Sequence, residues 1–102
     1  MVEYLYDSQG TWIAFKQDKY VFAPNGKWIG WLPWDDSDVA DRSGQYLGTI
    51  MLRNRLLKVR SQPYRGYPGY PGYPGYPGYP GYPGYAGPVI LPLGTDDVEI
   101  PD

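Results

Sequence analysis

The pattern of apolar and polar positions is the same in three blocks of the chain before residue 50. Each block has an apolar run, a polar turn that ends in glycine, and a second apolar run; the blocks cover residues 5–15, 21–31 and 39–49. An aliphatic residue lies five positions before the turn glycine, and an aromatic residue lies two positions after it, followed by Ile or Leu and then by Ala or Gly. This repetition indicates an architecture built from copies of one small unit.

Each block predicts a β-hairpin, because two apolar runs flank a short turn rich in Asp, Pro, Asn, Ser and Gly. The glycine that closes each turn favours the left-handed conformation that forms a bulge with the return strand. Period-two geometry is expected to place the aromatic and the small residue of the return strand on one face, and Ile or Leu on the other. The small residue predicts that another backbone approaches closely there.

The tryptophans of the return strands have two interpretations. Trp12 and Trp28 are either part of the core or an aromatic platform for a ligand. Pro33 lacks an N–H group and is expected to end the strand that contains Trp31. Because Pro33 interrupts the alternation, the pattern leaves the exposure of Trp31 and Trp34 open.

A fourth hairpin with a long insertion between its arms is predicted after residue 55. Residues 56–60 form its first arm, and residues 88–93 are expected to form the return arm, at an edge because of two prolines. Residues 98–100 are a candidate terminal strand. The chain is therefore predicted to be a single all-β domain made of residues 1–65 and 86–102, with residues 66–87 as an inserted low-complexity loop.

The insertion repeats Gly-Tyr-Pro six times and then ends with Gly84, Tyr85, Ala86 and Gly87. Proline removes backbone donors and the period of three matches neither helix nor strand, so a disordered loop that leans towards polyproline II is expected. Two other interpretations are collagen-like packing and a proline-rich ligand for an aromatic groove. A further one treats the tyrosines as evenly spaced aromatic stickers for multivalent association. These tyrosines are Tyr67, Tyr70, Tyr73, Tyr76, Tyr79, Tyr82 and Tyr85.

Composition excludes several kinds of chemistry. The 102-residue chain has no Cys and no His, which removes thiolate nucleophiles, disulfides and ordinary zinc or haem sites, and its net charge of −2 does not favour nucleic acid. No apolar run approaches the roughly 20 residues of a membrane span, and no signal peptide is visible, so a cytoplasmic protein is expected. Neither a metal nor a cofactor is predicted.

Acidic residues offer little support for an enzyme or a metal site. Residues 35–41 contain four carboxylates, but the segment lacks the glycine bend and the distal Glu of a calcium loop, so a solvated loop is the preferred interpretation. The adjacent pairs Asp35/Asp36 and Asp96/Asp97 would point to opposite faces of a strand and make no acid–base pair. The protein is therefore expected not to be an enzyme.

Hairpins without a helix must hide their edges, and a closed ring does so. The repeated unit, aliphatic–x–Asp–x–x–Gly–x–Trp–Ile–small, resembles the bacterial four-fold β-flower proteins over residues 4–60, and more loosely over residues 86–100. The resemblance implies an all-β fold, a pseudo-four-fold ring of hairpins that forms a small shallow barrel. An SH3-like barrel is the alternative, although it would need five dissimilar strands.

The resemblance provides no catalytic residues. The β-flower shape is similar to that of tubby-like and scramblase-type domains, which are associated with phosphoinositides or membranes. On that basis the basic residues Arg53, Arg55, Lys58 and Arg60 are candidates for contact with anionic lipid. The same cluster, with Arg65 beyond it, could equally be a solvated face or pair with the acidic loop or the acidic tail.

Two functional hypotheses remain. The first is a non-enzymatic binding or interaction module that contacts an anionic membrane surface or a protein partner. The alternative is a structural protein that self-associates through the tyrosines of the insertion. The sequence leaves the ligand and the oligomeric state open.

Overall fold

The computed structural model describes residues 2–100, and within them the chain forms eight strands and no helix. The strands are β1 (Val2–Tyr6), β2 (Trp12–Gln17), β3 (Tyr20–Phe22), β4 (Trp28–Trp31), β5 (Asp38–Asp41), β6 (Tyr46–Met51), β7 (Arg55–Val59) and β8 (Thr95–Asp97). They form one sheet in sequence order, and consecutive strands are antiparallel.

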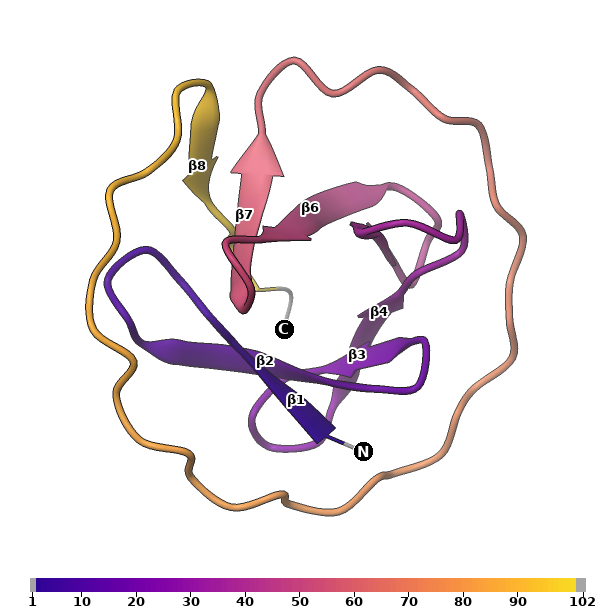
Figure 1. Ribbon diagram of the computed structural model, residues 1–102. Coiled ribbons are helices and arrows are strands. Elements are labelled where there is room, and N and C mark those ends of the chain that lie inside the picture. The colour runs from indigo at the N-terminus through magenta and orange to yellow at the C-terminus, as the bar shows by residue number, and fades with distance from the viewer. Residues whose placement is uncertain (1, 101–102) are drawn as a thin grey trace.

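The sheet closes into a ring, as the sequence predicted. Tyr6 of β1 pairs in parallel with Arg55 of β7, and the Tyr6 N–H donates to the Asn54 carbonyl at 2.8 Å. The three repeated blocks become the hairpins β1/β2, β3/β4 and β5/β6, which we call petals 1, 2 and 3; β7/β8 is petal 4. The view along the ring axis shows the petals around a common centre (Figure 1).

The turn residues explain why each block folds as a hairpin. In petal 1, the Asp7 carboxylate accepts hydrogen bonds from the N–H groups of Gln9 and Thr11, both at 2.9 Å. Gly10 donates its N–H to the Asp7 carbonyl at 3.2 Å and has a φ of 90°. The predicted left-handed glycine is thus confirmed, and Asp and Gly together define a compact turn.

A bulge recurs at the same place in petals 1, 2 and 3 and corrects the predicted faces of the return strands. In petal 1, Leu5 is opposite Ala14 whereas Tyr6 is opposite Trp12, so Ile13 is an extra residue. The extra residue breaks the period of two. Ala14 therefore lies in the aliphatic cluster inside the barrel, with Ile13 packed against that cluster, whereas Trp12 packs on a second, mainly aromatic cluster that contains Phe15 and Trp28. The prediction that the aromatic and the small residue share a face was wrong.

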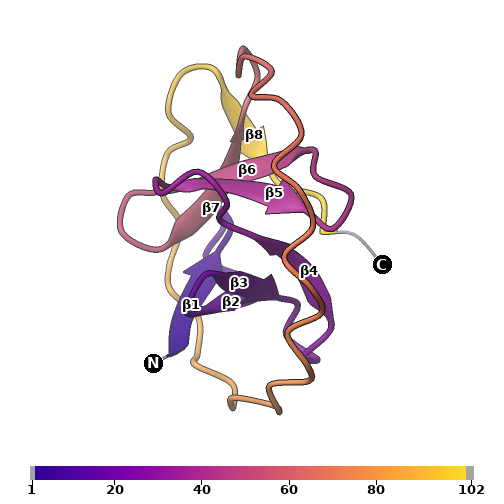
Figure 2. The ribbon, with the colours of Figure 1, turned by 90° about the vertical axis from the view of Figure 1, so that its right-hand side faces the viewer.

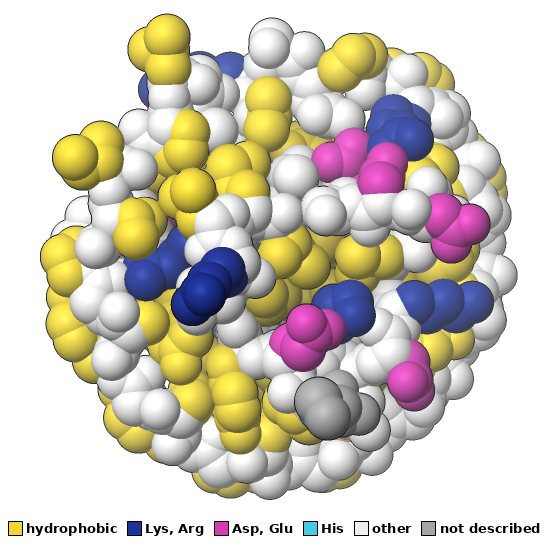
Figure 3. Space-filling model, in the orientation of Figure 1, with side chains coloured by type: hydrophobic (Ala, Val, Ile, Leu, Met, Phe, Trp, Pro, Cys, Tyr) yellow, Lys and Arg dark blue, Asp and Glu magenta, His cyan; other side chains and the backbone are white. Residues whose placement is uncertain are grey.

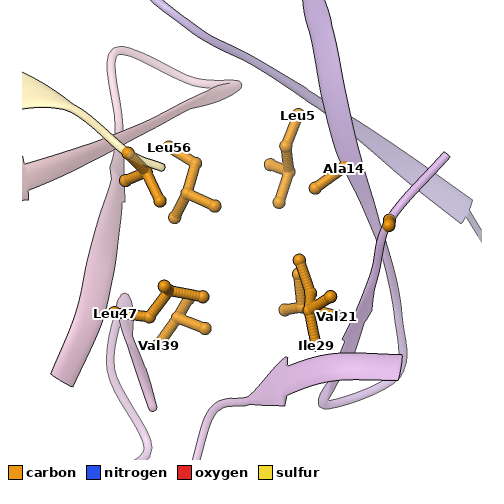
Figure 4. Close-up of a cluster of buried hydrophobic side chains, with 9 residues drawn as sticks. Leu5, Ala14, Val21, Ile29, Val39, Leu47 and Leu56 are labelled. Atoms are coloured by element: carbon orange, nitrogen blue, oxygen red, sulfur yellow. The ribbon is translucent and has the colours of Figure 1, made fainter. Parts of the chain in front are cut away.

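The inner core is a ring of aliphatic side chains that point to the barrel axis (Figure 4). Each of petals 1, 2 and 3 contributes its first-strand aliphatic residue, and all three side chains are at most 2% exposed. These residues are Leu5, Val21 and Val39, joined by Leu56 from petal 4. The repeat positions of the sequence therefore become symmetry-related positions of one core, which closure makes possible in so small a domain.

The small residues of the return strands do permit close approach, as predicted. A Cβ on Gly30 of β4 would collide with the backbone carbonyl of Ala40 in the neighbouring strand. At the equivalent Gly48 of β6, a Cβ would lie 2.7 Å from Cγ2 of Val98, a core residue that follows β8. Gly30 thus lets two strands approach, and Gly48 makes room for the C-terminal segment.

Petal 4 differs from its prediction. Residues 88–93 form no strand; the return strand is β8, which pairs Thr95 with Val59 and Asp97 with Leu57. Two prolines deprive residues 88–93 of donors, and the Thr95 N–H instead closes a turn onto the Pro92 carbonyl at 3.1 Å. The apolar side chains of Ile90 and Leu93 are consequently exposed, at 93% and 104%. Residues 98–100 also form no strand.

The insertion has no regular secondary structure, as predicted for a low-complexity loop, and the structure places it against the barrel. Residues 66–87 form neither helix nor strand, but they follow the outside of the barrel and surround petals 3, 2 and 1 in turn (Figures 1 and 2). The molecule is a disc with extents of 35, 34 and 23 Å, and the insertion forms its rim. We call residues 66–87 the belt.

Candidate functional site

Arg65 fixes the start of the belt to the acidic loop. Its Nη1 atom lies 2.5 Å from Oδ2 of Asp36 and 2.8 Å from Oδ2 of Asp38, and its guanidinium stacks 4.7 Å from the centre of the Trp34 ring. The hydrogen bond from Arg65 holds the pKa of Asp36 below its ordinary value. Two carboxylates of the acidic loop are therefore paired with an arginine of the same chain.

Backbone hydrogen bonds and a buried arginine fix the end of the belt to petal 1. The Ala86 N–H donates to the Gly10 carbonyl at 3.0 Å, and the Val89 N–H donates to the Ser8 carbonyl at 2.8 Å. Arg55, only 6% exposed, donates to the carbonyls of Asp7 at 3.0 Å and Gly87 at 2.8 Å. A guanidinium, with five donors in a fixed fork, suits this cluster of carbonyls.

Between these ends, tyrosines of the belt pack on the two tryptophans of petals 1 and 2. The Trp28 ring lies 5.7 Å from Tyr70 and 5.9 Å from Tyr73, centre to centre. The Trp12 ring lies 6.0 Å from Tyr79 and 5.9 Å from Tyr82. Trp28, 2% exposed, is therefore a core residue, which is the first of the two interpretations, and the protein's own tyrosines pack on its ring. The platform for an external ligand stays a prediction.

Other belt tyrosines cover the glycines at the tips of the petals. Tyr67 lies over Gly44 of petal 3, and Tyr76 lies over Gly26 of petal 2. A Cβ on Gly44 would be 2.6 Å from Cδ1 of Tyr67, and one on Gly26 would collide with the Tyr76 ring. The turn glycines thus serve twice, because they allow the left-handed turn and leave space for the belt.

The belt backbone is neither collagen-like nor polyproline II. Every glycine from Gly66 to Gly87 has a positive φ, between 82° and 95°. Polyproline II and collagen need φ near −75° at each residue, whereas proline followed by a left-handed glycine matches the centre of a type II turn. The repeated turn curves the chain, which lets it follow a small barrel.

The belt leaves much of each tyrosine in solvent. The seven belt tyrosines are between 57% and 66% exposed, although Tyr70, Tyr73, Tyr79 and Tyr82 also contact tryptophan. Figure 3 shows hydrophobic side chains along the rim of the disc and an apolar hollow at the centre of this face. The rim is thus an evenly spaced series of amphipathic aromatic groups.

The basic residues that the sequence singled out have different environments. Arg55 is buried and bonds backbone carbonyls, as described above, and Arg60 forms an ion pair with Asp96 at 2.8 Å. Hydrogen bonding to Arg60 lowers the pKa of Asp96. Arg53 and Lys58 are exposed, on the β6–β7 turn and in β7. Of the alternatives, pairing with the acidic tail is therefore confirmed for Arg60, and pairing with the acidic loop for Arg65.

A hollow beside β1 has a mixed apolar and charged lining. The hollow at the barrel mouth, about 320 Å³, is lined by apolar Leu5 and Ile50 and by Glu3, Lys16 and Arg53. Glu3 and Lys16 form an ion pair with each other at 2.9 Å. Within residues 2–100, no three acidic side chains converge as a metal site would require.

Sequence reasoning missed the residues that flank the tryptophans. Tyr4 and Tyr20 pack edge-on against Trp12 and Trp28, and the Arg42 guanidinium lies 5.1 Å from the Trp28 ring centre. The Tyr4 hydroxyl also donates to the Pro80 carbonyl in the belt at 3.0 Å. A signal was present, because Tyr4 and Tyr20 precede the repeated aliphatic residue in petals 1 and 2.

Comparison with known proteins adds the family. A family model described as "4-fold beta flower protein" matches residues 2–95. No match was found among curated proteins or among solved structures. In the part of the chain that the structure describes, there is no helix of the length and hydrophobicity that would cross a membrane.

Proposed function

The chain belongs to the 4-fold beta flower protein family, and from this premise we propose that it is a non-enzymatic interaction module that self-associates through the tyrosines of the belt. The barrel is the scaffold, and the belt tyrosines are the contact groups. The partner is a second copy of the chain.

The observation that carries this proposal is the exposure of the belt tyrosines. All seven are more than half exposed, and they recur at every third residue of the belt. Tyrosine offers a large amphipathic contact area with few rotatable bonds, so ordering it costs little entropy. Many weak contacts of equal geometry add up to avidity.

The charges favour a protein partner over an anionic membrane. Two of the four candidate basic residues are engaged, Arg55 with backbone carbonyls and Arg60 with Asp96. The remaining Arg53 and Lys58 would contribute only about 1 kcal/mol each to lipid contact. The net charge of −2 does not assist such a contact.

Sedimentation velocity over a concentration series tests self-association. We expect the wild type to show concentration-dependent oligomers, and we expect Tyr67→Ser/Tyr76→Ser/Tyr85→Ser to reduce them strongly while the barrel stays folded by circular dichroism. The matched control, Ile90→Ser/Leu93→Ser, removes exposed apolar side chains outside the belt. The proposal fails if the wild type stays monomeric at high concentration, or if only the control variant loses association.

A further inference from the structure

We propose that the outer surfaces over Trp12 and Trp28 are two equivalent recognition sites for a Gly-Tyr-Pro segment, and that the belt of a second copy can occupy them by exchange. This inference rests on the self-association proposed above and names its partner segment and its sites. The site of petal 1 contains Tyr4 and Trp12; that of petal 2 contains Tyr20 and Trp28.

The two sites are built in the same way. Each tryptophan is flanked by the tyrosine of the preceding strand at nearly a right angle, with ring centres 5.7 Å apart for Tyr4 and Trp12 and 6.3 Å apart for Tyr20 and Trp28. Each indole N–H donates to the carbonyl two residues later, at 2.8 Å for Trp12 and 2.7 Å for Trp28. These barrel contacts orient both indoles independently of the belt.

The occupants are also equivalent. Each tryptophan contacts two belt tyrosines that are three residues apart, Tyr70 and Tyr73 on Trp28 and Tyr79 and Tyr82 on Trp12. Tyr79 follows Tyr70 by nine residues, and Tyr82 follows Tyr73 by nine. Three triplets of the belt therefore correspond to one petal of the barrel.

Petal 3 shows what the recognition requires. Tyr46 replaces the tryptophan, and its hydroxyl is engaged with the Thr49 hydroxyl at 2.6 Å and with the Val59 N–H at 3.0 Å. Asp38 occupies the position that Tyr4 and Tyr20 have in petals 1 and 2. The belt tyrosine near this petal, Tyr67, lies over the turn glycine instead of an indole. The sequence of the barrel thus provides two sites.

The periodicity of the belt makes exchange possible. Because every triplet is identical from Gly66 to Pro83, a shift by three residues would present the same groups to the same tryptophans. Only the ends distinguish one register from another, through Arg65 and Ala86. A recognition site that contacts only one type of triplet binds the belt of its own chain and the belt of another copy through the same groups. Tethering favours the intramolecular belt through effective concentration alone.

The test vacates one site in the full chain. Tyr70→Ser/Tyr73→Ser removes both rings from Trp28 and leaves Trp12 occupied. The matched control is Tyr64→Ser/Tyr85→Ser, which removes two tyrosines that have no ring partner among the described aromatic pairs. The probe is a nine-residue peptide of three Gly-Tyr-Pro triplets, with a Gly-Ser-Pro peptide for comparison. The readout is the indole N–H resonance of each tryptophan.

We expect the vacated variant to bind the Gly-Tyr-Pro peptide with saturation at one equivalent and at least tenfold more tightly than the wild type or the control variant. The Trp28 resonance should shift and the Trp12 resonance should not. The reciprocal variant, Tyr79→Ser/Tyr82→Ser, should reverse this pattern. Unlabelled wild-type protein added to the labelled vacated variant should produce the same Trp28 shift as the peptide, which identifies the second copy as the donor.

The inference is overturned if the vacated variant binds the peptide no more tightly than the wild type, or binds the Gly-Ser-Pro peptide equally well. It is also overturned if the peptide shifts Trp28 but the wild-type protein does not, since exchange between copies would then not occur. These failures are separate from the failure of self-association, because a wild type that sediments as oligomers can do so through outward tyrosine faces with its own belt in place.

Discussion

Ala86 donates its backbone N–H to the carbonyl of Gly10, at 3.0 Å, where the triplet repeat has alanine in place of proline. Proline has no N–H to donate, so an uninterrupted repeat could not make this bond. The single break in the repeat thus allows a backbone hydrogen bond between the end of the belt and petal 1.

Ala86→Pro should loosen the end of the belt. The substitution removes a hydrogen bond of about 1 kcal/mol and also restricts Tyr85. We expect the neighbouring Val89 amide, which donates to Ser8, to exchange its hydrogen about fivefold faster, as measured by NMR. Pro83→Ala, which adds an N–H one triplet earlier, serves as control and should leave this rate unchanged. An unchanged rate in Ala86→Pro would remove the structural role assigned to this bond.

Arg55→Lys should destabilise the closure of the ring. The buried guanidinium donates to carbonyls of petal 1 and of the belt, and lysine has no planar fork to replace it. We expect the free energy of unfolding to fall by about 2 kcal/mol, the range for hydrogen bonds to charged groups. Urea denaturation measures the change. Arg53→Lys, at an exposed position, is the control, and equal effects of both would contradict the assignment.

Trp28→Ala should be among the most destabilising substitutions in the barrel. The side chain is 2% exposed and contacts Tyr20, Tyr70 and Tyr73. Its truncation is expected to cost about 3–5 kcal/mol. Trp34→Ala, at a half-buried position beside Arg65, should cost clearly less. Thermal and urea unfolding of the two variants decide the order.

Gly30→Ala should cost more than Gly48→Ala. At Gly30 the added methyl group meets the backbone of β5, which cannot move without disturbing the sheet, and overpacking of this kind costs about 1–3 kcal/mol. At Gly48 the nearest atom belongs to the Val98 side chain. The double variant Gly48→Ala/Val98→Ala should therefore recover part of the stability that Gly48→Ala loses. The corresponding double variant Gly30→Ala/Val39→Ala should recover less. Equal unfolding free energies for the two alanine variants would refute this.

The start of the belt should detach in acid. Arg65 lowers the pKa of Asp36 in the folded protein. The stability that this ion pair contributes is therefore fully present above the ordinary carboxyl pKa of about 3.9, and it is lost as the pH falls through the lower pKa that Asp36 has in the folded state. A pH titration of the Trp34 indole resonance should report the release of Arg65 below about pH 4. Asp36→Asn should weaken the contact at neutral pH and flatten this titration, and an unaltered titration would argue against the anchor.

Much of the fold could be predicted from the repeat. Identical spacing around Gly10, Gly26 and Gly44 determines hairpins, left-handed turns and equivalent core positions, because these depend on residues close together in the chain. Ring closure followed from the need to cover sheet edges. The face of the return strand was predicted wrongly, because Ile13 and its equivalents are bulge residues and a single extra residue reverses the alternation.

The candidate site could be predicted only in its components. The tyrosines were identified as contact groups and Trp12 and Trp28 as core or platform, but their pairing depends on a chain that returns around the barrel from petal 3 to petal 1. No local pattern specifies that path. The role of Arg55 was likewise invisible, since its carbonyl partners come from two segments that are distant in sequence.

The sequence by itself thus determined the unit, its turns, its number of copies and the period of the belt, since each is a property of neighbouring residues. The tertiary structure alone decided that the belt lies on the barrel. Three triplets of the belt match the distance from one petal to the next only because the petals are arranged in a ring. Proline and left-handed glycine keep the belt out of the sheet, and the tyrosine–tryptophan contacts hold it against the outer wall.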